Sequence, residues 1–336
     1  MADRGGLDRE GSRAVKVCVV GAGAVGGWIA GMLVRAGTDV SLFARGETLA
    51  ALRADGLRVR RREAEDVYRL AVSADPAALG QPDAVIVAVK GQNIPAVAPA
   101  IEKLLGPDTT VIPAINGIPW WFFQVPGVPL SGLSLSAVDP DGMTARAIAP
   151  ERVIGCVVHA SAWTPRPGVV EVQGEDRLIF GEPDGVPSQR CGDLAAAFGE
   201  SPVRVVVSEH IRHDIWAKLW GNMTMNPLSV LTGATTTRML SDPGVRGLVR
   251  AMMLEMQDLG TVIGLPIAMT PEERMAVTIR LGDIKTSMLR DWEAGRDIEI
   301  GPLLGALAEI AGRAGQPAPH LHAVLGLLRL RAATRA

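Results

Sequence analysis

Three polar residues in the second half of the chain are spaced so that they could act on one bound molecule. Lys218, Asn222 and Asn226 follow one another at intervals of four residues, so they share one face of any helix that contains them. A lysine on such a face can supply a positive charge and a proton to a reacting group. The same stripe is also typical of the solvated side of an amphipathic helix, and the residues alone favour that interpretation.

The element that must carry this stripe is a helix predicted over residues 210–225. Its large apolar residues fall on a different face from Lys218, as expected for a helix that packs against the rest of the protein. Pro227 lacks a backbone donor and disfavours the helical conformation of the residue before it. We therefore expect the helix to end or to kink at Pro227.

A glycine-rich turn near the start of the chain is a second candidate site. It consists of Gly21, Ala22, Gly23, Ala24, Val25 and Gly26. An apolar run over 15–20 precedes it and a helical pattern over 28–34 follows, which is the context of a dinucleotide-binding turn. Gly21 permits the tight turn, Gly23 lets the backbone approach a pyrophosphate, and Gly26 allows close packing of helix and strand. The helix N-terminus then favours phosphates, so we favour a dinucleotide site over a chance glycine turn.

The residues that follow the next predicted strand, 39–43, bear on the choice of cofactor. An enzyme that uses NAD usually places an acid there to bind the ribose hydroxyls, whereas a nearby arginine accommodates the 2′-phosphate of NADP. The strand is followed by Ala44, Arg45 and Gly46, and the first acid is Glu47. Arg45 therefore favours NADP(H), with a solvated loop arginine as the alternative.

Two further polar residues follow predicted strands of the same sheet. The run over 84–89 is continuously apolar, as is typical of a central parallel strand, and Lys90 comes directly after it. A short strand predicted over 109–112 leads to Asn116. Because ligands bind at the carboxyl ends of the strands in open α/β sheets, we expect Lys90 and Asn116 to converge on the edge that holds the glycine turn.

The remaining patterns divide the chain near Ser208. Further strands are predicted over 57–60, 67–72, 153–163, 169–173, 177–180 and 203–207, and helices over 94–105 and 194–198. From residue 209 onward the patterns are helical. We therefore predict an α/β fold, in which an N-terminal Rossmann-type doubly wound sheet over 14–208 precedes an all-α C-terminal domain over 209–336. Residues 1–13 are predicted to be a disordered tail.

Composition argues against several classes of partner. The net charge of -2 gives no reason to expect nucleic acid or an anionic membrane. Cys18, Cys156 and Cys191 are widely spaced and lack metal-binding spacing, which predicts reduced thiols in a cytoplasmic protein and no metal site. Residues 17–34 carry no charge, but their five glycines fit a strand and a turn better than a membrane helix.

Taken together, these motifs resemble those of the ketopantoate reductase (2-dehydropantoate 2-reductase) family. The glycine turn, Lys90 and Asn116 are similar to the nucleotide-binding half of that family. The segment 218–228 resembles its catalytic helix, and the segment 287–300 resembles its C-terminal signature. The resemblance covers nearly the whole chain after the tail, and it favours a functional face at Lys218 over a solvated one.

The resemblance implies a role for each residue. Lys218 matches the lysine that protonates the carbonyl oxygen as hydride arrives, and Glu299 matches a position near the cofactor that could also orient this lysine. The implied substrate contacts are Asn116, Asn222, Asn226 and Ser287, the last of them to the carboxylate. Lys90, Asn116 and Glu299 are implied to lie close to the cofactor. The role implied for Lys218 is chemically reasonable, because a cationic lysine stabilises the negative charge that develops on the carbonyl oxygen and can also donate the proton.

The implied reaction is the NADPH-dependent reduction of 2-dehydropantoate to pantoate, a step of pantothenate biosynthesis. The partner would be a small-molecule 2-oxo acid, with homodimerisation left open. One alternative is a related reductase of another 2-oxo acid or of an imine, and a second is a non-catalytic NADP(H) redox sensor. A sensor needs the glycine turn but has no need of Lys218, Asn222 and Glu299, so their joint presence favours an enzyme.

Two departures from the pattern of the family leave the identity of the substrate open. Thr236 stands where the family often has another asparagine, and the aromatic run 120–123 is atypical of its best-known members. We favour a packing role for this run over a wall beside the nicotinamide or substrate. Ser287 with Arg290 could hold a carboxylate, although many surface pairs could do the same.

Overall fold

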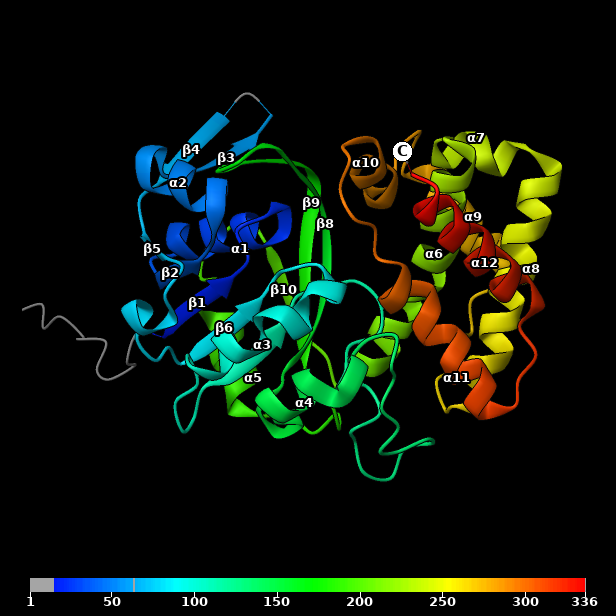
Figure 1. Ribbon diagram of the computed structural model, residues 1–336, viewed down its shortest axis with the longest axis horizontal. Helices are drawn as coiled ribbons and strands as arrows, with labels where there is room; N and C mark the ends of the chain where they lie inside the picture. The colour runs from blue at the N-terminus through cyan, green and yellow to red at the C-terminus, as the bar shows by residue number, and fades with distance from the viewer. Residues whose placement is uncertain (1–14, 63, 336) are drawn as a thin grey trace, which may run out of the picture.

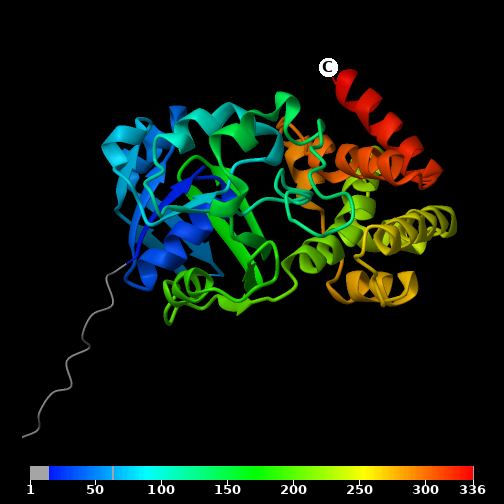
Figure 2. The ribbon, with the colours of Figure 1, turned by 90° about the horizontal axis from the view of Figure 1, so that it is seen from below.

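The computed structural model describes residues 15–62 and 64–335, so the tail predicted for residues 1–13 lies outside the described residues. Figure 1 shows the strands gathered in one half of the molecule and a cluster of helices in the other, and Figure 2 shows the same division from below. The predicted α/β fold is confirmed, with a Rossmann-type N-terminal part and a helical C-terminal part.

The first sheet is parallel and has the strand order β5-β2-β1-β6-β7. Its strands are β1 (Lys16–Val20), β2 (Asp39–Phe43), β5 (Ala71–Ser73), β6 (Ala84–Val87) and β7 (Thr110–Pro113). The central strands are buried on both faces, which explains their continuous apolar sequences. Their carboxyl ends lie at one edge of the sheet, where the predicted ligand-binding loops begin.

Helices cover both faces of this sheet, as a doubly wound fold requires. Figure 1 shows α3 and α4 in front of the sheet and α1 behind it. The helices of this part are α1 (Ala24–Arg35), α2 (Gly46–Asp55), α3 (Ile94–Glu102), α4 (Met143–Ala147) and α5 (Gln189–Ala196). One buried core lies on the side of α1, and the other lies on the side of α3 and extends into the C-terminal helices.

A second sheet packs on the other side of α1. Its strands are β3 (Leu57–Arg61), β4 (Ala64–Tyr68), β8 (Gly155–Arg166), β9 (Val169–Gly181) and β10 (Arg204–Val207). Gly27 and Gly31 of α1 permit this contact, because a Cβ at either position would lie 2.7 Å from a valine of the second sheet. In Figure 1, β8 and β9 stand between the first sheet and the C-terminal helices.

Two strand predictions in this region were wrong. The segment 67–72 is divided between β4, which is antiparallel to β3, and β5, which joins the parallel sheet. Conversely, the strands predicted over 169–173 and 177–180 are one strand, β9, which pairs with three neighbours. Local periodicity cannot report which sheet a strand joins, because that choice depends on distant pairing partners.

The C-terminal part is helical throughout its described residues, as predicted. Its elements are α6 (Ile211–Thr232), α7 (Thr236–Ser241), α8 (Pro243–Val262), α9 (Pro271–Arg280), α10 (Ser287–Glu293), a π-helical turn (Gly301–Gly305), α11 (Ala306–Ala314) and α12 (Pro319–Ala333). Among the described residues, no helix combines the length and apolar character needed to cross a membrane.

Of the two outcomes expected at Pro227, an end or a kink of the helix, the end was wrong. Helix α6 continues through Pro227 to Thr232 and ends at Gly233, which adopts a left-handed conformation. A proline inside a helix costs about 3 kcal/mol. The residues on both sides of Pro227 are buried against the core, and this packing outweighs the local preference. Asn226 is therefore helical and stays on the face of Lys218.

The aromatic run 120–123 packs in the interior, as favoured from the sequence. All four side chains are buried, and Phe122 stacks on Trp216 of α6 with the ring centroids 6.5 Å apart. Arg212 of α6 lies over the ring of Phe122 and donates a hydrogen bond to its carbonyl oxygen. The run thereby joins the sheet-containing part of the protein to the helix that carries Lys218.

Candidate active site

The glycine turn has the geometry expected of a phosphate-binding turn. Gly21 has a φ of 98° and donates a hydrogen bond to the Phe43 carbonyl. A Cβ on Gly26 would overlap the carbonyl oxygen of Gly21, so helix and turn can approach only because Gly26 has no side chain. A Cβ on Gly23 would meet nothing within 4 Å. Gly23 caps α1, and no side chain of the described residues makes a capping hydrogen bond at that end of the helix, which leaves its N–H groups available to an anion.

Arg45 lies beside this turn because β2 pairs with β1, and Phe43 is aligned with Val20. It is exposed at the start of α2, with its guanidinium 5.0 Å from the centroid of the Phe43 ring. Among the described residues no acid forms an ion pair with Arg45. Its charge is therefore available to a ligand at the edge where the glycine turn ends.

Lys218 of α6 points towards the first and second sheets. Its Nζ donates hydrogen bonds to the Asn116 Oδ1 at 2.8 Å and to the Val158 carbonyl oxygen at 2.6 Å. An ammonium group has three donors, so one remains for a ligand within the part of the chain described. Burial lowers the pKa of Lys218 to about 8, although Cys156 and Glu299 act in the opposite direction.

The other residues of the stripe lie on the same helix as Lys218, and one of them borders a cavity beside it. Asn222 is half-buried and borders a small cavity of about 10 Å³, with Lys218 and Trp121 in its wall. Asn226 is 6% exposed. Neither side-chain amide forms a hydrogen bond within the described residues. Both amides can therefore serve a polar ligand, which is what the resemblance implies for them.

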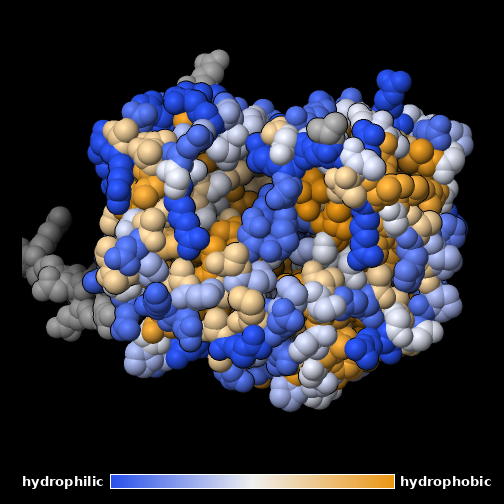
Figure 3. Space-filling view, in the orientation of Figure 1, coloured by the Kyte–Doolittle hydropathy of each residue, from blue (hydrophilic) through white to orange (hydrophobic). Residues whose placement is uncertain are grey.

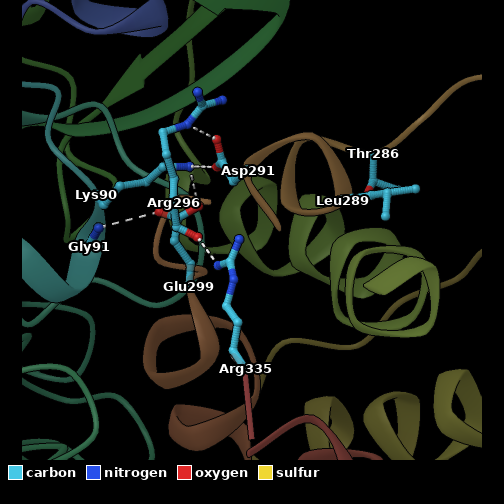
Figure 4. Close-up of polar contacts among 8 residues, drawn as sticks. All are labelled: Lys90, Gly91, Thr286, Leu289, Asp291, Arg296, Glu299 and Arg335. Atoms are coloured by element: carbon cyan, nitrogen blue, oxygen red, sulfur yellow. Dashed lines mark hydrogen bonds and ion pairs between the residues drawn. The ribbon is translucent and has the colours of Figure 1, made fainter. Parts of the chain in front are cut away.

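Lys90 joins the two parts of the protein through an ion-pair cluster (Figure 4). Its Nζ pairs with Asp291 of α10 and lies 3.5 Å from the Glu299 Oε2. Glu299 also accepts a hydrogen bond from the Gly91 backbone at 3.3 Å, and Asp291 accepts one from Arg296 at 2.8 Å. Burial alone would lower the pKa of Lys90, but the carboxylates of Glu299 and Asp291 raise it above its usual value. The cluster holds Lys90 charged at the edge of the first sheet.

Glu299 contacts Lys90 rather than Lys218. It acts on Lys218 through its charge, which raises the pKa of that lysine, but no hydrogen bond joins them in the described structure. Asp291 was not assigned to the site from sequence. Its only local signal is its position four residues after Ser287 in the same helix.

Ser287 is the exposed first residue of α10. The preceding Thr286 caps this helix through the Leu289 backbone N–H and contacts Ser229 of α6 at 2.6 Å. Figure 4 shows Thr286 and Leu289 at the start of α10, away from the ion pairs of Lys90. No contact within the described residues joins Ser287 to Lys218, so its role as a substrate contact stays a prediction.

Thr236 does not contribute to the stripe on α6. It is buried, and its hydroxyl contacts the backbone of the 282–284 loop, accepting from Ile284 and donating to Gly282. The three cysteines are buried free thiols. Within 15–62 and 64–335, no group of three or more His, Cys, Asp or Glu side chains could hold a metal ion.

Contacts of Lys218 with Asn116 and of Lys90 with Glu299 thus cross the boundary between the two parts of the molecule. Figure 3 shows hydrophilic residues along this boundary, with hydrophobic residues on both sides of it. A Rossmann-type sheet with a glycine turn of this geometry, opposite a lysine with a lowered pKa, is typical of dinucleotide-dependent oxidoreductases.

Comparison with known proteins identifies the family. Residues 17–119 match the family described as "Ketopantoate reductase PanE/ApbA", and residues 210–332 match "Ketopantoate reductase PanE/ApbA C terminal". The chain belongs to the ketopantoate reductase family and is an oxidoreductase. The resemblance seen in the sequence is therefore confirmed.

Individual relatives cover almost the whole chain. The 2-dehydropantoate 2-reductase of Mesorhizobium japonicum is 39% identical over 96% of this chain and 99% of its own. A solved structure from Ralstonia solanacearum MolK2 is 46% identical with a TM-score of 0.92, and it covers 96% of this chain and 99% of its own. The 2-dehydropantoate 2-reductase structure from Methylococcus capsulatus is 28% identical with a TM-score of 0.81 and the same coverage.

Proposed function

We propose that this protein reduces 2-dehydropantoate to pantoate with NADPH. The observation that carries the proposal is the position of Lys218, which is bonded to Asn116 and Val158 and retains one donor for a ligand. The relatives named 2-dehydropantoate 2-reductase support the choice of reaction. The small-molecule partner is then a 2-oxo acid, and homodimerisation stays a prediction.

The glycine turn and Arg45 fit the cofactor. The space beside Gly23 would take the pyrophosphate, and the unpaired Arg45 would meet the 2′-phosphate that distinguishes NADPH from NADH. When bound, the nicotinamide supplies the hydride. Lys90, Asn116 and Glu299 lie at or next to the same edge of the sheet, where the family resemblance assigns cofactor contacts.

Lys218 serves as the proton donor in this proposal. Negative charge develops on the carbonyl oxygen as its carbon is reduced, and the ammonium of Lys218 stabilises that charge before it donates the proton. Asn116 holds the ammonium in place through its Oδ1. Asn222 and Asn226 offer unpartnered amides to the polar groups of the substrate, and Ser287 is the further contact implied by the resemblance.

The two alternatives differ from this proposal in measurable ways. A reductase of another 2-oxo acid or of an imine would share Lys218 and the cofactor site but prefer a different substrate. A redox sensor would bind NADP(H) without turnover. Burial of the Lys218 ammonium lowers its pKa to about 8 and costs folding stability. A sensor has no catalytic use for such a lysine and therefore no reason to retain it.

The direct test is a panel of 2-oxo acids with and without a branched hydroxymethyl group, followed by NADPH oxidation. We expect ketopantoate to have the highest kcat/KM. Ketopantoate turning over no better than pyruvate would contradict the substrate assignment alone. NADPH binding without oxidation across the whole panel would instead favour the sensor.

Cofactor choice gives a separate prediction. Arg45→Ala should weaken NADPH binding by about 1.5–3 kcal/mol, roughly 10–150-fold, because a charge-assisted contact to the 2′-phosphate is lost. NADH binding should change little, since NADH lacks that phosphate. Fluorescence titration of both cofactors measures this, and equal losses for the two would show that Arg45 does not read the phosphate.

The lowered pKa of Lys218 predicts an alkaline limit on reduction. The ammonium form is the proton donor, so kcat/KM should be level below the pKa of about 8 and fall about tenfold per pH unit above it. Burial raises the pKa of the neighbouring Cys156 to about 12, so this thiol cannot cause the fall. Cys156→Ala should therefore keep the alkaline fall, with a midpoint no higher than that of the wild type, because Cys156 acts to raise the pKa of Lys218. A level profile up to pH 10 would contradict proton donation by Lys218.

A further inference from the structure

A second group of basic residues, His159, Arg177 and Arg274, lies close to Lys218. His159 on β8 and Arg177 on β9 are directly opposite each other in the antiparallel pairing, so their side chains share one face. The preceding pair on that face, Val157 and Ile179, packs in the core that includes α6. His159 and Arg177 therefore face the helix that carries Lys218.

Arg274 of α9 approaches the same region from the helical side. Its guanidinium lies against the backbone of Gly221, where a Cβ would overlap Nη2 and lie 2.6 Å from Cζ. Gly221 directly precedes Asn222 and is about one helical turn from Lys218. The glycine thus provides the space that places a guanidinium beside the stripe of Lys218 and Asn222.

Neither arginine has a carboxylate partner among the described residues. Among the described residues, the guanidinium of Arg274 donates one hydrogen bond, from Nη1 to the Thr278 hydroxyl at 3.0 Å. Burial lowers the pKa of Arg274, and no acid of the described residues acts to raise it. The buried acids Asp291 and Glu299 are bound by other groups.

His159 adds no charge to this region at neutral pH. Burial, followed by the positive charges of Lys218, Arg177 and Arg274, lowers the pKa of His159 to about 4. The imidazole is therefore neutral beside three cations. Because Arg177 and Arg274 have no carboxylate partner among the described residues, a bound anion would relieve the repulsion between these charges.

We infer that Arg274, with Arg177, binds the carboxylate of the substrate and selects 2-oxo acids over neutral ketones. The inference rests on the proposed function, because it assumes that the carbonyl of the substrate lies at Lys218. The carboxylate of a 2-oxo acid is on the adjacent carbon, and a planar guanidinium beside Gly221 suits it. Ser287 would then add an uncharged contact. Arg290, the other candidate from α10, lies over the Trp163 ring at 4.7 Å.

The test measures binding rather than turnover. Pantoate and its methyl ester, which lacks the negative charge, are titrated calorimetrically into protein saturated with NADP⁺. We expect Arg274→Gln to weaken pantoate about 10–100-fold, the scale of a lost charge-assisted contact, and to change the ester less than about threefold. Arg274→Lys should restore part of the affinity for pantoate. Arg280→Gln, an exposed arginine of the same helix, is the matched control and should match the wild type.

Two results would overturn the inference. One is a loss of the same size for pantoate and the ester, and the other is unchanged pantoate binding. If Arg274→Gln does not fold, Arg177→Gln gives an independent second test, because Arg177 lies on a different element. We expect it to show the same selective loss of pantoate binding. Failure of the proposed function would give a different result from failure of this inference. NADPH would not be oxidised with any 2-oxo acid, while pantoate and its ester would still differ in their response to Arg274→Gln.

Discussion

Lys218→Ala should lower kcat for ketopantoate reduction by about 10²–10⁴-fold, the usual contribution of a positioned general acid. The interaction of the ammonium with the substrate oxygen strengthens as negative charge develops, so the loss falls on the chemical step. Binding of NADPH should change little, because the glycine turn and Arg45 belong to the first sheet and its loops.

Stopped-flow measurement of hydride transfer at saturating substrate separates this role from a structural one. Lys285→Ala is the matched control, since Lys285 is an exposed lysine of the helical part that pairs with Glu293. We expect this control to transfer hydride at the wild-type rate. A Lys218→Ala protein that did the same would show that Lys218 is only a helix-surface lysine.

Gly26→Ala should impair both folding stability and cofactor binding. The added Cβ would overlap the Gly21 carbonyl oxygen and lie 3.0 Å from the Ala88 Cβ, so the backbone of the turn must move. Overpacking of this kind costs about 1–3 kcal/mol or more. Because the displaced atoms belong to the turn that would hold the pyrophosphate, we expect NADPH affinity to fall about 100-fold.

Substitutions at two other glycines separate an effect on folding stability from an effect on cofactor binding. A Cβ on Gly23 meets nothing within 4 Å, so Gly23→Ala should retain the wild-type Tm yet weaken NADPH, because the methyl group occupies the space proposed for the pyrophosphate. A Cβ on Gly312 in α11 also meets nothing within 4 Å, so Gly312→Ala should leave NADPH affinity unchanged and raise the Tm slightly, because alanine is about 0.5–1 kcal/mol more favourable than glycine inside a helix. Thermal melts and NADPH titrations measure both. Unchanged NADPH affinity in Gly26→Ala and Gly23→Ala would contradict the assignment of this turn.

The sequence predicts the first sheet well because its signals are local. Continuous apolar runs identify β1, β6 and β7, and the strand–turn–helix order identifies the glycine turn. The course of α6 through Pro227 was not predictable in this way. Helix propensity and proline geometry are local, whereas the burial that overrides them comes from helices far along the chain.

In the candidate site, too, the local features were predictable from sequence and the long-range contacts were not. Helical spacing places Lys218, Asn222 and Asn226 together, and the structure keeps them on one continuous helix. The bond from Lys90 to Asp291 joins residues that are 201 positions apart, so no local pattern could indicate it. The place of Arg274 had only one signal in the sequence, a glycine directly before Asn222, and that signal has no meaning until α9 is seen against it.

Isotope transfer tests the central claim most directly. The protein is incubated with ketopantoate and NADPH that carries two deuterium atoms at the reactive nicotinamide carbon, and the product is analysed by NMR and mass spectrometry. If the protein is an NADPH-dependent ketopantoate reductase, one deuterium appears on carbon 2 of pantoate for each NADPH oxidised. NADPH oxidation that yields no pantoate, or pantoate that carries no deuterium at that carbon, would contradict it.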